Sequence, residues 1–482
     1  MNASRPIIAV IPFGARATSP RAGAWARQIA RRLVDRFARD DALDVRPVFL
    51  VTVPETKTDA SYLVFGSSPD PDLAASYGAS LGATHALTGT LYEDAAGRHL
   101  GVSLVEVASR AVIASGPLAV SSNELHLLEP ALASWLVTTL GLISTAALGT
   151  AAANEIAYAA LLEGMDEEVS ETLLRQSDAN AADAALVSAL ARYVDALRAD
   201  PECVAAEERL LFLAAQALER GGIDRHITAL EELTVLRPRS WRAHYMLGQL
   251  RAESDDAGGA VVAFEHANSL RALPPQDVVR LAKLYARSGA HASALSHLRR
   301  VERGAGEVPA MARRLRFGIA QPDLERDLEQ AGAILAIGDV ARLDEAESTF
   351  RRAVEAEPDL WEAHFGLGLV ARQRGDAAAA IASLRKVLEL WPEQPDGLHE
   401  LGVALLLANR TDEAVQPLER AAALRPGDAG YLADAGFALL RRGDLATARE
   451  RLEHARTLDE SDPITRTYLD ELERVEAAAK TT

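Results

Sequence analysis

The sequence predicts an α+β protein in which a small N-terminal α/β domain, a mixed sheet with flanking helices, precedes an all-α superhelical solenoid. Apolar runs rich in Val, Ile and Leu alternate with helical patterns over residues 1–142. From about residue 327 the chain repeats itself every 34 residues. The length of 482 residues leaves room for two or three domains.

The N-terminal region should contain five strands and three helices, in the order strand, helix, strand, helix, three strands, helix. This order favours helices packed on a mixed sheet. In the first helix Trp25, Ile29, Leu33 and Phe37 recur every four residues and form an apolar face. We expect strands at residues 7–13, 45–53, 85–92, 100–107 and 112–120.

The first helix is also rich in arginine. Most of these side chains fall on faces other than the apolar one. We expect them to form a solvated surface, with a basic face toward a partner as the alternative. The arginines are Arg27, Arg31, Arg32, Arg36 and Arg39.

The stretch GASLG, from Gly78 to Gly82, has the G-x-S-x-G pattern of a hydrolase nucleophile elbow. In that elbow a strand precedes the serine and a helix follows it. Here Ser80 follows a helical pattern and precedes a strand, so the order is inverted. We therefore expect no catalytic role for Ser80, and we expect Gly82 to end the helix in a left-handed conformation.

Composition narrows the classes of function. The single cysteine, Cys203, excludes an intramolecular disulfide and a cysteine zinc cage, and the eleven histidines lack ligand spacing. We expect no metal and no cofactor. The net charge is −18, and residues 1–150 hold 12 Lys and Arg against 13 Asp and Glu. A nucleic-acid partner is not expected, because neutralising phosphates requires a basic face.

Two stretches bear on localisation. The start, MNASRPIIAVIPF, shows no secretory signal pattern, which favours a cytoplasmic protein. Residues 132–153 are uncharged and just long enough to span a bilayer, but they are mostly small residues without basic flanks. A helix end that runs into a linker at residues 143–153 is the preferred interpretation. Because this linker lacks large apolar side chains, the parts on either side of it should fold separately.

Three stretches carry a resemblance to a known domain: IIAVIPF, YGASLGATHALTGTL and GRHLGVSLVEVASRAVIAS. They resemble the amino-terminal domain of TolB, over about residues 6–142 of a domain placed at 1–142. No β-propeller follows, so the role of TolB in the envelope is not implied. In similar bacterial proteins this domain precedes helical repeats and often accompanies cyclase, kinase or DNA-binding domains.

The 34-residue repeat resembles the tetratricopeptide unit, in which small residues let two antiparallel helices approach and a large apolar residue fills the space between pairs. We expect about eight units over residues 154–462, clearest from 327, with a break at 304–323. A capping helix and tail should occupy residues 463–482, with an apolar stripe formed by Ile464, Tyr468, Leu472 and Val475. The residues in step are Ala346, Ala380, Ala414 and Ala448; Phe350, Leu384, Leu418 and Leu452; Pro358, Pro392 and Pro426; and Gly368, Gly402 and Gly436.

No phosphate loop, dinucleotide fingerprint, zinc signature or kinase motif occurs in the sequence, so we expect a protein that is not an enzyme. The favoured function is an interaction scaffold that binds a protein or peptide partner. The alternatives are a regulatory subunit of a separate cyclase, kinase or transcription factor, and an accessory subunit in envelope or glycan assembly. The tetratricopeptide resemblance implies that the partner binds in the concave groove, at Phe365, Leu369, Arg372, His399, Val403, Leu406, Phe437 and Leu440.

The same resemblance limits the kind of partner. Repeats that hold acidic peptide tails use Lys and Asn in a carboxylate clamp, and this sequence departs from that pattern. An apolar strip rimmed by Arg372 and Arg441 instead favours recognition of a helix or segment in the groove. The alternative is that neighbouring repeats or the N-terminal domain already cover these residues.

Overall fold

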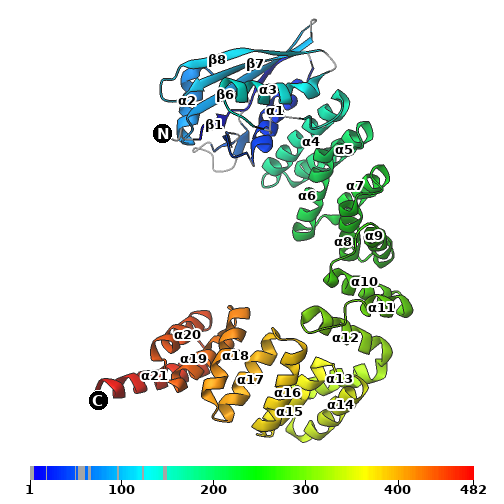
Figure 1. Ribbon diagram of the computed structural model, residues 1–482, viewed down its shortest axis with the longest axis vertical. Helices are drawn as coiled ribbons and strands as arrows, with labels where there is room; N and C mark the ends of the chain where they lie inside the picture. Colours follow the sequence, from blue (N-terminus) through cyan, green and yellow to red (C-terminus); the bar gives the residue numbers. More distant parts are fainter. Residues whose placement is uncertain are drawn as a thin grey trace. The chain divides into compact units, whose positions relative to one another are not determined.

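The computed structural model describes residues 5–481 except 18, 39, 49, 53–59, 63–66, 95–96, 122–123 and 145–148. The chain divides into two compact units, residues 1–272 and 273–482. The first unit holds an α/β domain and the first helical repeats, and the second holds the remaining repeats (Figure 1). The predicted fold class is confirmed: a small mixed-sheet domain precedes a tetratricopeptide-type helical solenoid.

The main sheet is mixed, as predicted. Its strand order is β3-β1-β6-β7-β8, and the short β2 also pairs with β6. Strand β1 runs parallel to both β3 and β6, whereas β6, β7 and β8 form antiparallel hairpins. The strands span Ile7–Val10 (β1), Gly14–Arg16 (β2), Asp44–Pro47 (β3), His85–Asp94 (β6), Gly97–Glu106 (β7) and Val112–Val120 (β8).

The apolar run expected to be one strand at residues 45–53 is divided in two. Strand β3 ends at Pro47, and β4 (Leu50–Thr52) pairs with β5 (Ala60–Tyr62) in a separate two-stranded sheet. Proline has no backbone N–H to donate, so Pro47 ends the ladder with β1. Val53 lies outside the described residues.

Helices cover both faces of the main sheet. Successive residues from Ile8 to Ile11, at the end of β1 and just beyond it, belong alternately to two apolar cores. Ile8 and Val10 share a core with α1 (Ala22–Phe37) and α3 (Leu128–Thr139). Ala9 and Ile11 share a second core with α2 (Pro71–Ser80). The predicted apolar face of α1 is confirmed, because all four of its residues are buried: Trp25, Ile29, Leu33 and Phe37.

The described residues 155–272 of the first unit form six helices. They form three consecutive antiparallel pairs that begin a few residues after the linker (Figure 1). Helix α4 is preceded by Asn154, whose side chain accepts a hydrogen bond from the Ala157 amide and caps the helix. The helices span Glu155–Leu174 (α4), Ala179–Ala199 (α5), Val204–Arg220 (α6), Ile223–Leu236 (α7), Trp241–Glu253 (α8) and Ala257–Leu270 (α9).

The second unit continues the pairs, with helix α12 inserted between the pair α10/α11 and the pair α13/α14. Helix α12 therefore occupies the break in the repeat register. The helices span Pro275–Arg287 (α10), His291–Leu298 (α11), Glu307–Ala320 (α12), Pro322–Ala336 (α13), Leu343–Ala356 (α14), Trp361–Gln373 (α15), Ala377–Leu390 (α16), Pro395–Leu407 (α17), Thr411–Leu424 (α18), Ala429–Arg442 (α19), Leu445–Leu458 (α20) and Pro463–Thr481 (α21).

Packing inside each pair follows the residues that repeat in step. The four alanines of the repeat are fully buried, and the large residues that follow them are 3% exposed or less. Glycines on the first helices face these large residues: a Cβ on Gly368 would lie 2.8 Å from the Cγ of Leu384. The same close approach joins Gly436 to Leu452 and, in the first unit, Gly248 to Phe264.

The terminal helix α21 buries a different face from the one expected. Asp462 caps it by accepting hydrogen bonds from the backbone amides of Ile464 and Thr465. Leu472 is buried as predicted, but Ile464 and Val475 are exposed, and Thr465 and Leu469 take their place. The expected stripe follows apolar character alone, whereas the helix turns the small Thr465 inward because its hydroxyl also bonds to Asp462.

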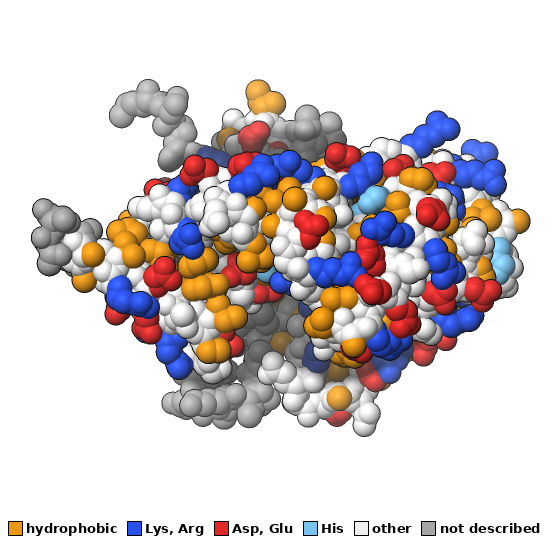
Figure 2. All heavy atoms as spheres, turned by 90° about the horizontal axis from the view of Figure 1, so that it is seen from below, with side chains coloured by type: hydrophobic (Ala, Val, Ile, Leu, Met, Phe, Trp, Pro, Cys, Tyr) orange, Lys and Arg blue, Asp and Glu red, His pale blue; other side chains and the backbone are white. Residues whose placement is uncertain are grey.

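The uncharged stretch at residues 132–153 does not form one long helix. Helix α3 ends at Thr139, α4 begins at Glu155, and residues 145–148 lie outside the description. Within the described part of the chain, none of the helices combines the length and the apolar character needed to cross a membrane. On the face that Figure 2 presents, acidic and basic side chains are interspersed with smaller apolar areas.

Candidate functional site

The predicted groove residues lie on the first helices of three consecutive pairs, α15, α17 and α19. Seven of the eight are half-buried, so each keeps some surface toward solvent. Leu440 is the exception: it is only 5% exposed and belongs to the core of the last repeats. The prediction that Leu440 is a groove residue is therefore replaced: it is a core residue, because α19 turns this position toward its packed neighbours.

A set of polar contacts joins these helices to one another. The Nε of Arg372 on α15 lies 2.8 Å from the Oε2 of Glu400 on α17. The Nε2 of His399 on α17 lies 2.8 Å from the Oδ2 of Asp434 on α19. The hydroxyl of Tyr468 on α21 donates to the same carboxylate at 3.3 Å. Each contact bridges one pair to the next, so the contacts fix the spacing of neighbouring repeats.

Aromatic rings reinforce the same line of contacts. His399 stacks on Tyr431 with ring centroids 4.3 Å apart, and Phe437 stacks on Tyr468 at the same distance. The guanidinium of Arg441 lies 5.7 Å from the centre of the Phe437 ring. Arg372 and Arg441, expected as a rim, are thus held against a carboxylate and a ring. Neighbouring helices cover the predicted apolar strip in part.

The acidic residues of these helices were not predicted from the sequence as part of the groove. Burial raises the pKa of Glu400 above its usual value, and the Arg372 guanidinium opposes this shift. A signal was present in the sequence, because acids occupy two positions of the first helix, each in two of the three repeats. They are Glu362 on α15, Asp396 and Glu400 on α17, and Asp434 on α19.

An apolar cleft of about 520 Å³ lies beside α12 in the second unit. The indole rings of Trp361 and Trp391, which meet edge to face with centroids 5.3 Å apart, line it together with Met311 and Leu315 of α12. Glu362 lies at its edge, with the Nε of Arg314 3.4 Å from its Oε1. Burial raises the pKa of Glu362 to about 7.

Ser80 is not placed as a nucleophile. It is the last residue of α2, and its hydroxyl donates a hydrogen bond to the backbone oxygen of Tyr77 at 2.7 Å. Strand β6 follows, beginning at His85, and Gly82 has a φ of +63°. The predicted order of elements around Ser80 is therefore confirmed, and so is the left-handed glycine.

Three of the arginines that we expected on a solvated surface, Arg27, Arg32 and Arg36, instead contact acidic side chains, and Arg39 lies outside the described residues. The guanidinium of Arg27 donates to both carboxylate oxygens of Asp166 on α4, at 3.0 and 2.6 Å, and Gln28 donates to the same carboxylate. The indole N–H of Trp25 donates to Glu163, also on α4, at 3.2 Å. The expectation was wrong for Arg27 because its acidic partner lies 139 residues away in the sequence.

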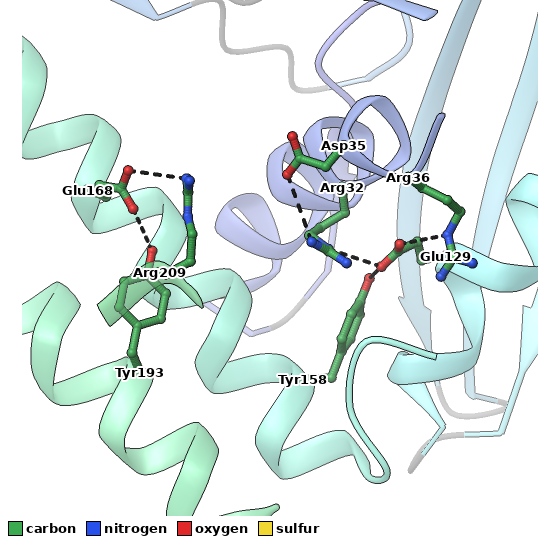
Figure 3. A network of polar contacts seen from close by, with 8 residues as sticks. All are labelled: Arg32, Asp35, Arg36, Glu129, Tyr158, Glu168, Tyr193 and Arg209. Carbon is green, nitrogen blue, oxygen red and sulfur yellow. Dashed lines mark hydrogen bonds and ion pairs between the residues drawn. The ribbon is translucent and has the colours of Figure 1, made fainter. Parts of the chain in front are cut away.

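Two more arginines of α1, Arg32 and Arg36, converge on a buried carboxylate (Figure 3). Glu129 of α3 is fully buried, with the Nε of Arg36 at 2.9 Å and the Nε of Arg32 at 3.5 Å. The hydroxyl of Tyr158 on α4 donates to the same carboxylate at 2.8 Å. Burial and the charge of Glu129 raise the pKa of Tyr158 well above its usual value, so its hydroxyl keeps its proton.

A second cluster, of one glutamate, one tyrosine and one arginine, lies among the first repeats (Figure 3). The carboxylate of Glu168 on α4 accepts a hydrogen bond from the Tyr193 hydroxyl at 2.8 Å and lies 3.2 Å from a guanidinium nitrogen of Arg209. Burial and the charge of Glu168 raise the pKa of Tyr193 well above its usual value. In each cluster a buried carboxylate holds an arginine that reaches toward the surface.

These arginines reach a cleft of about 820 Å³ inside the first unit. Helix α1 supplies one wall, and the first helices of the second and third pairs, α6 and α8, supply the others. The cleft thus lies where the α/β domain meets the repeats. Its charged lining consists of Arg32, Asp35, Arg36, Glu208, Arg209 and Arg242, and its larger apolar and aromatic lining consists of Leu211, Phe212, Trp241, Tyr245 and Met246.

Antiparallel helix pairs in 34-residue register, with alanine and glycine at their contacts, define a helical-repeat protein. Two family models described as tetratricopeptide repeat match residues 338–395 and 371–433. This part of the chain therefore consists of tetratricopeptide repeats.

Comparisons with whole proteins cover only parts of the chain. Human tetratricopeptide repeat protein 13 is 29% identical over 167 residues, which are 34% of this chain and 19% of that protein. The chain thus matches about a fifth of the length of this relative. A tetratricopeptide repeat protein from Parabacteroides merdae is 13% identical over 55% of this chain and 98% of its own, with a TM-score of 0.28. YrrB, described as having an unusual peptide-binding site, is 14% identical over 50% of this chain and 98% of its own, with a TM-score of 0.26.

Proposed function

We propose that the protein is a non-catalytic interaction scaffold whose last repeats bind an amphipathic segment of a partner protein. The observation that carries the proposal is the composition of the first helices α15, α17 and α19. They present half-buried apolar side chains, such as Phe365, Val403 and Phe437, next to acidic ones. Alternating apolar and charged groups on successive helices are the features that an amphipathic helix or peptide uses for docking.

The acids of these helices bear on the charge of a matching partner. The four carboxylates of the first helices are Glu362, Asp396, Glu400 and Asp434. An arginine lies beside each of the first three, namely Arg314, Arg425 and Arg372, whereas Asp434 contacts His399 and Tyr468. A partner that places Lys or Arg beside its apolar residues would match these acids. The missing Lys and Asn clamp agrees with this preference, because an acidic tail would meet carboxylates.

The experiment is capture of partners by the full chain, followed by their identification with mass spectrometry. Phe365→Glu and Phe437→Glu should each abolish capture of the main partner, because each places a charge in the apolar part of the groove. Leu458→Glu is the matched control, since Leu458 is exposed at the end of α20, the second helix of its pair. All variants are first compared by circular dichroism and thermal melting.

The outcomes separate cleanly. Loss of the partner in both phenylalanine variants, with retention in Leu458→Glu, supports the groove. Retention of the partner at wild-type levels by both phenylalanine variants contradicts it. The likeness of residues 6–142 to the TolB amino-terminal domain stays part of this proposal. It supports a second role for that domain, as in a regulatory subunit that acts with a separately encoded enzyme or transcription factor.

A further inference from the structure

We propose that the cleft between α1, α6 and α8 binds a small anion that carries a flat ring, the chemistry of a nucleoside phosphate. This site differs from the groove of the last repeats, because all of its walls belong to residues 1–272. Its volume of about 820 Å³ lies in the range of small-ligand sites.

The anion would be recognised by arginines that are already held in place. Glu129 and Glu168 hold Arg32 and Arg209 from the protein interior, and the side chains of these arginines are 19% and 22% exposed (Figure 3). A guanidinium carries five N–H donors in a fixed fork, so a carboxylate on one side leaves donors for a phosphate on the other. Holding the side chain in advance lowers the entropy lost on binding.

Arg242 completes this set from α8, where it is exposed. Asp35 and Glu208 also line the cleft, and Asp35 lies 3.9 Å from Arg32. The lining therefore holds four guanidinium groups and two carboxylates, with Glu129 and Glu168 behind it. Because these four positive and four negative charges balance, recognition relies on short-range hydrogen bonds and depends only weakly on salt.

Aromatic side chains line the cleft beside these arginines, on the same helices α6 and α8. Phe212 on α6 is 48% exposed although it is a large apolar side chain. Trp241 and Tyr245 on α8 stack on each other with centroids 4.8 Å apart, which fixes the Tyr245 ring at the cleft. A flat ring gains affinity by stacking on such side chains. A ligand that carries both an anion and a ring would contact both the arginines and the aromatic side chains.

Isothermal titration calorimetry on the full chain tests this proposal, with adenosine 5′-diphosphate as the probe. We expect saturable binding, with adenosine alone and inorganic phosphate alone each at least about tenfold weaker, because each makes only one of the two kinds of contact. Arg242→Ala and Phe212→Ala should each weaken binding of the diphosphate by about tenfold or more. Both side chains are exposed, so neither change removes core packing.

Matched controls are Arg220→Ala and Val235→Ala, which remove exposed side chains of the same repeats outside the cleft and should leave binding unchanged. The proposal is overturned if the diphosphate does not bind, or if Arg242→Ala and Phe212→Ala bind it as the wild type does. Phosphate alone binding as tightly as the diphosphate also overturns it. So does tighter binding of a ten-residue glutamate peptide that is lost in Arg242→Ala, since that assigns the cleft to a peptide.

Discussion

Gly402 on α17 and Leu418 on α18 approach so closely that a Cβ on the glycine would lie 2.3 Å from the Cγ of the leucine. Real Cβ atoms do not come so near another carbon, so the two helices can pack this way only without a side chain at position 402. Gly368 and Gly436 make the same approach one repeat before and one repeat after. The glycines that recur in the sequence therefore mark where the helices of each pair touch.

Gly402→Ala should destabilise the protein by about 1 to 3 kcal/mol, because the new methyl group forces α17 and α18 apart or moves Leu418 off its preferred rotamer. The midpoint of urea unfolding measures the change. Gly427→Ala is the control, since no atom lies within 4 Å of the position of its Cβ. An unchanged midpoint for Gly402→Ala would contradict the close approach, and Leu418→Ala in the same chain should recover part of the loss.

Asp166→Ala should cost about 2 to 3 kcal/mol, because this carboxylate accepts hydrogen bonds from Arg27 and Gln28, and Arg27 would lose its counter-charge. A double-mutant cycle with Arg27→Ala isolates the coupling between the two side chains. Glu345→Ala, which breaks an exposed pair with Arg342, should cost less stability than Asp166→Ala. Equal costs for the two alanine variants would argue against a stabilising contact between α1 and α4.

A fragment of residues 1–272 should melt in one cooperative transition, whereas residues 1–142 alone should be less stable or fail to melt cooperatively. One apolar core runs from Ile8 through Trp25 and Tyr158 to Ala263, so a cut in the linker divides it. This reverses the expectation from the linker composition that the two parts fold separately. Differential scanning calorimetry of both fragments decides between the two expectations. A cooperative transition of residues 1–142 at a temperature close to that of the longer fragment would support separate folding.

Glu362→Gln should make stability less dependent on pH. The pKa of Glu362 is raised by burial from 4.5 to about 7, so between these values the folded protein keeps a proton that the unfolded chain has lost. The stabilisation that Glu362 contributes is therefore fully present below pH 4.5 and is lost as the pH rises through about 7.

From about pH 5 to about pH 8 the wild type should lose about 1 to 3 kcal/mol more stability than Glu362→Gln. Urea unfolding at several pH values measures this difference. Glu355→Gln on α14 is the control, because it replaces an exposed acid outside the cleft beside α12. Parallel pH profiles for the wild type and Glu362→Gln would show that Glu362 does not titrate in this range.

The features that the sequence predicted correctly depend on local spacing. Gly402, Ala414 and Leu418 recur at fixed distances, so the helix pairs could be predicted without knowing any contact between them. The contact of Arg27 with Asp166 could not be predicted in this way. The two residues are 139 positions apart in the sequence, and neither belongs to a repeating pattern.

The remaining differences have equally specific causes. The buried face of α21 was not predicted because Thr465, a polar residue, turns inward. There its hydroxyl donates a hydrogen bond to the Asp462 carboxylate. The burial of Leu440 depends on how α19 is rotated against its neighbours, which periodicity alone does not give. The cleft between α1, α6 and α8 is formed by three helices from distant parts of the chain, so no single sequence motif predicts it.

The position of α12 has a consequence for how such a chain can change in length. Helix α12 is inserted singly and interrupts the alternation of first and second helices. After it, Gly–Leu contacts join the first helix to the second in the pairs α15/α16, α17/α18 and α19/α20, so gain or loss of 34 residues at a time keeps this contact within each remaining pair. The last repeats can thus lengthen or shorten in whole pairs.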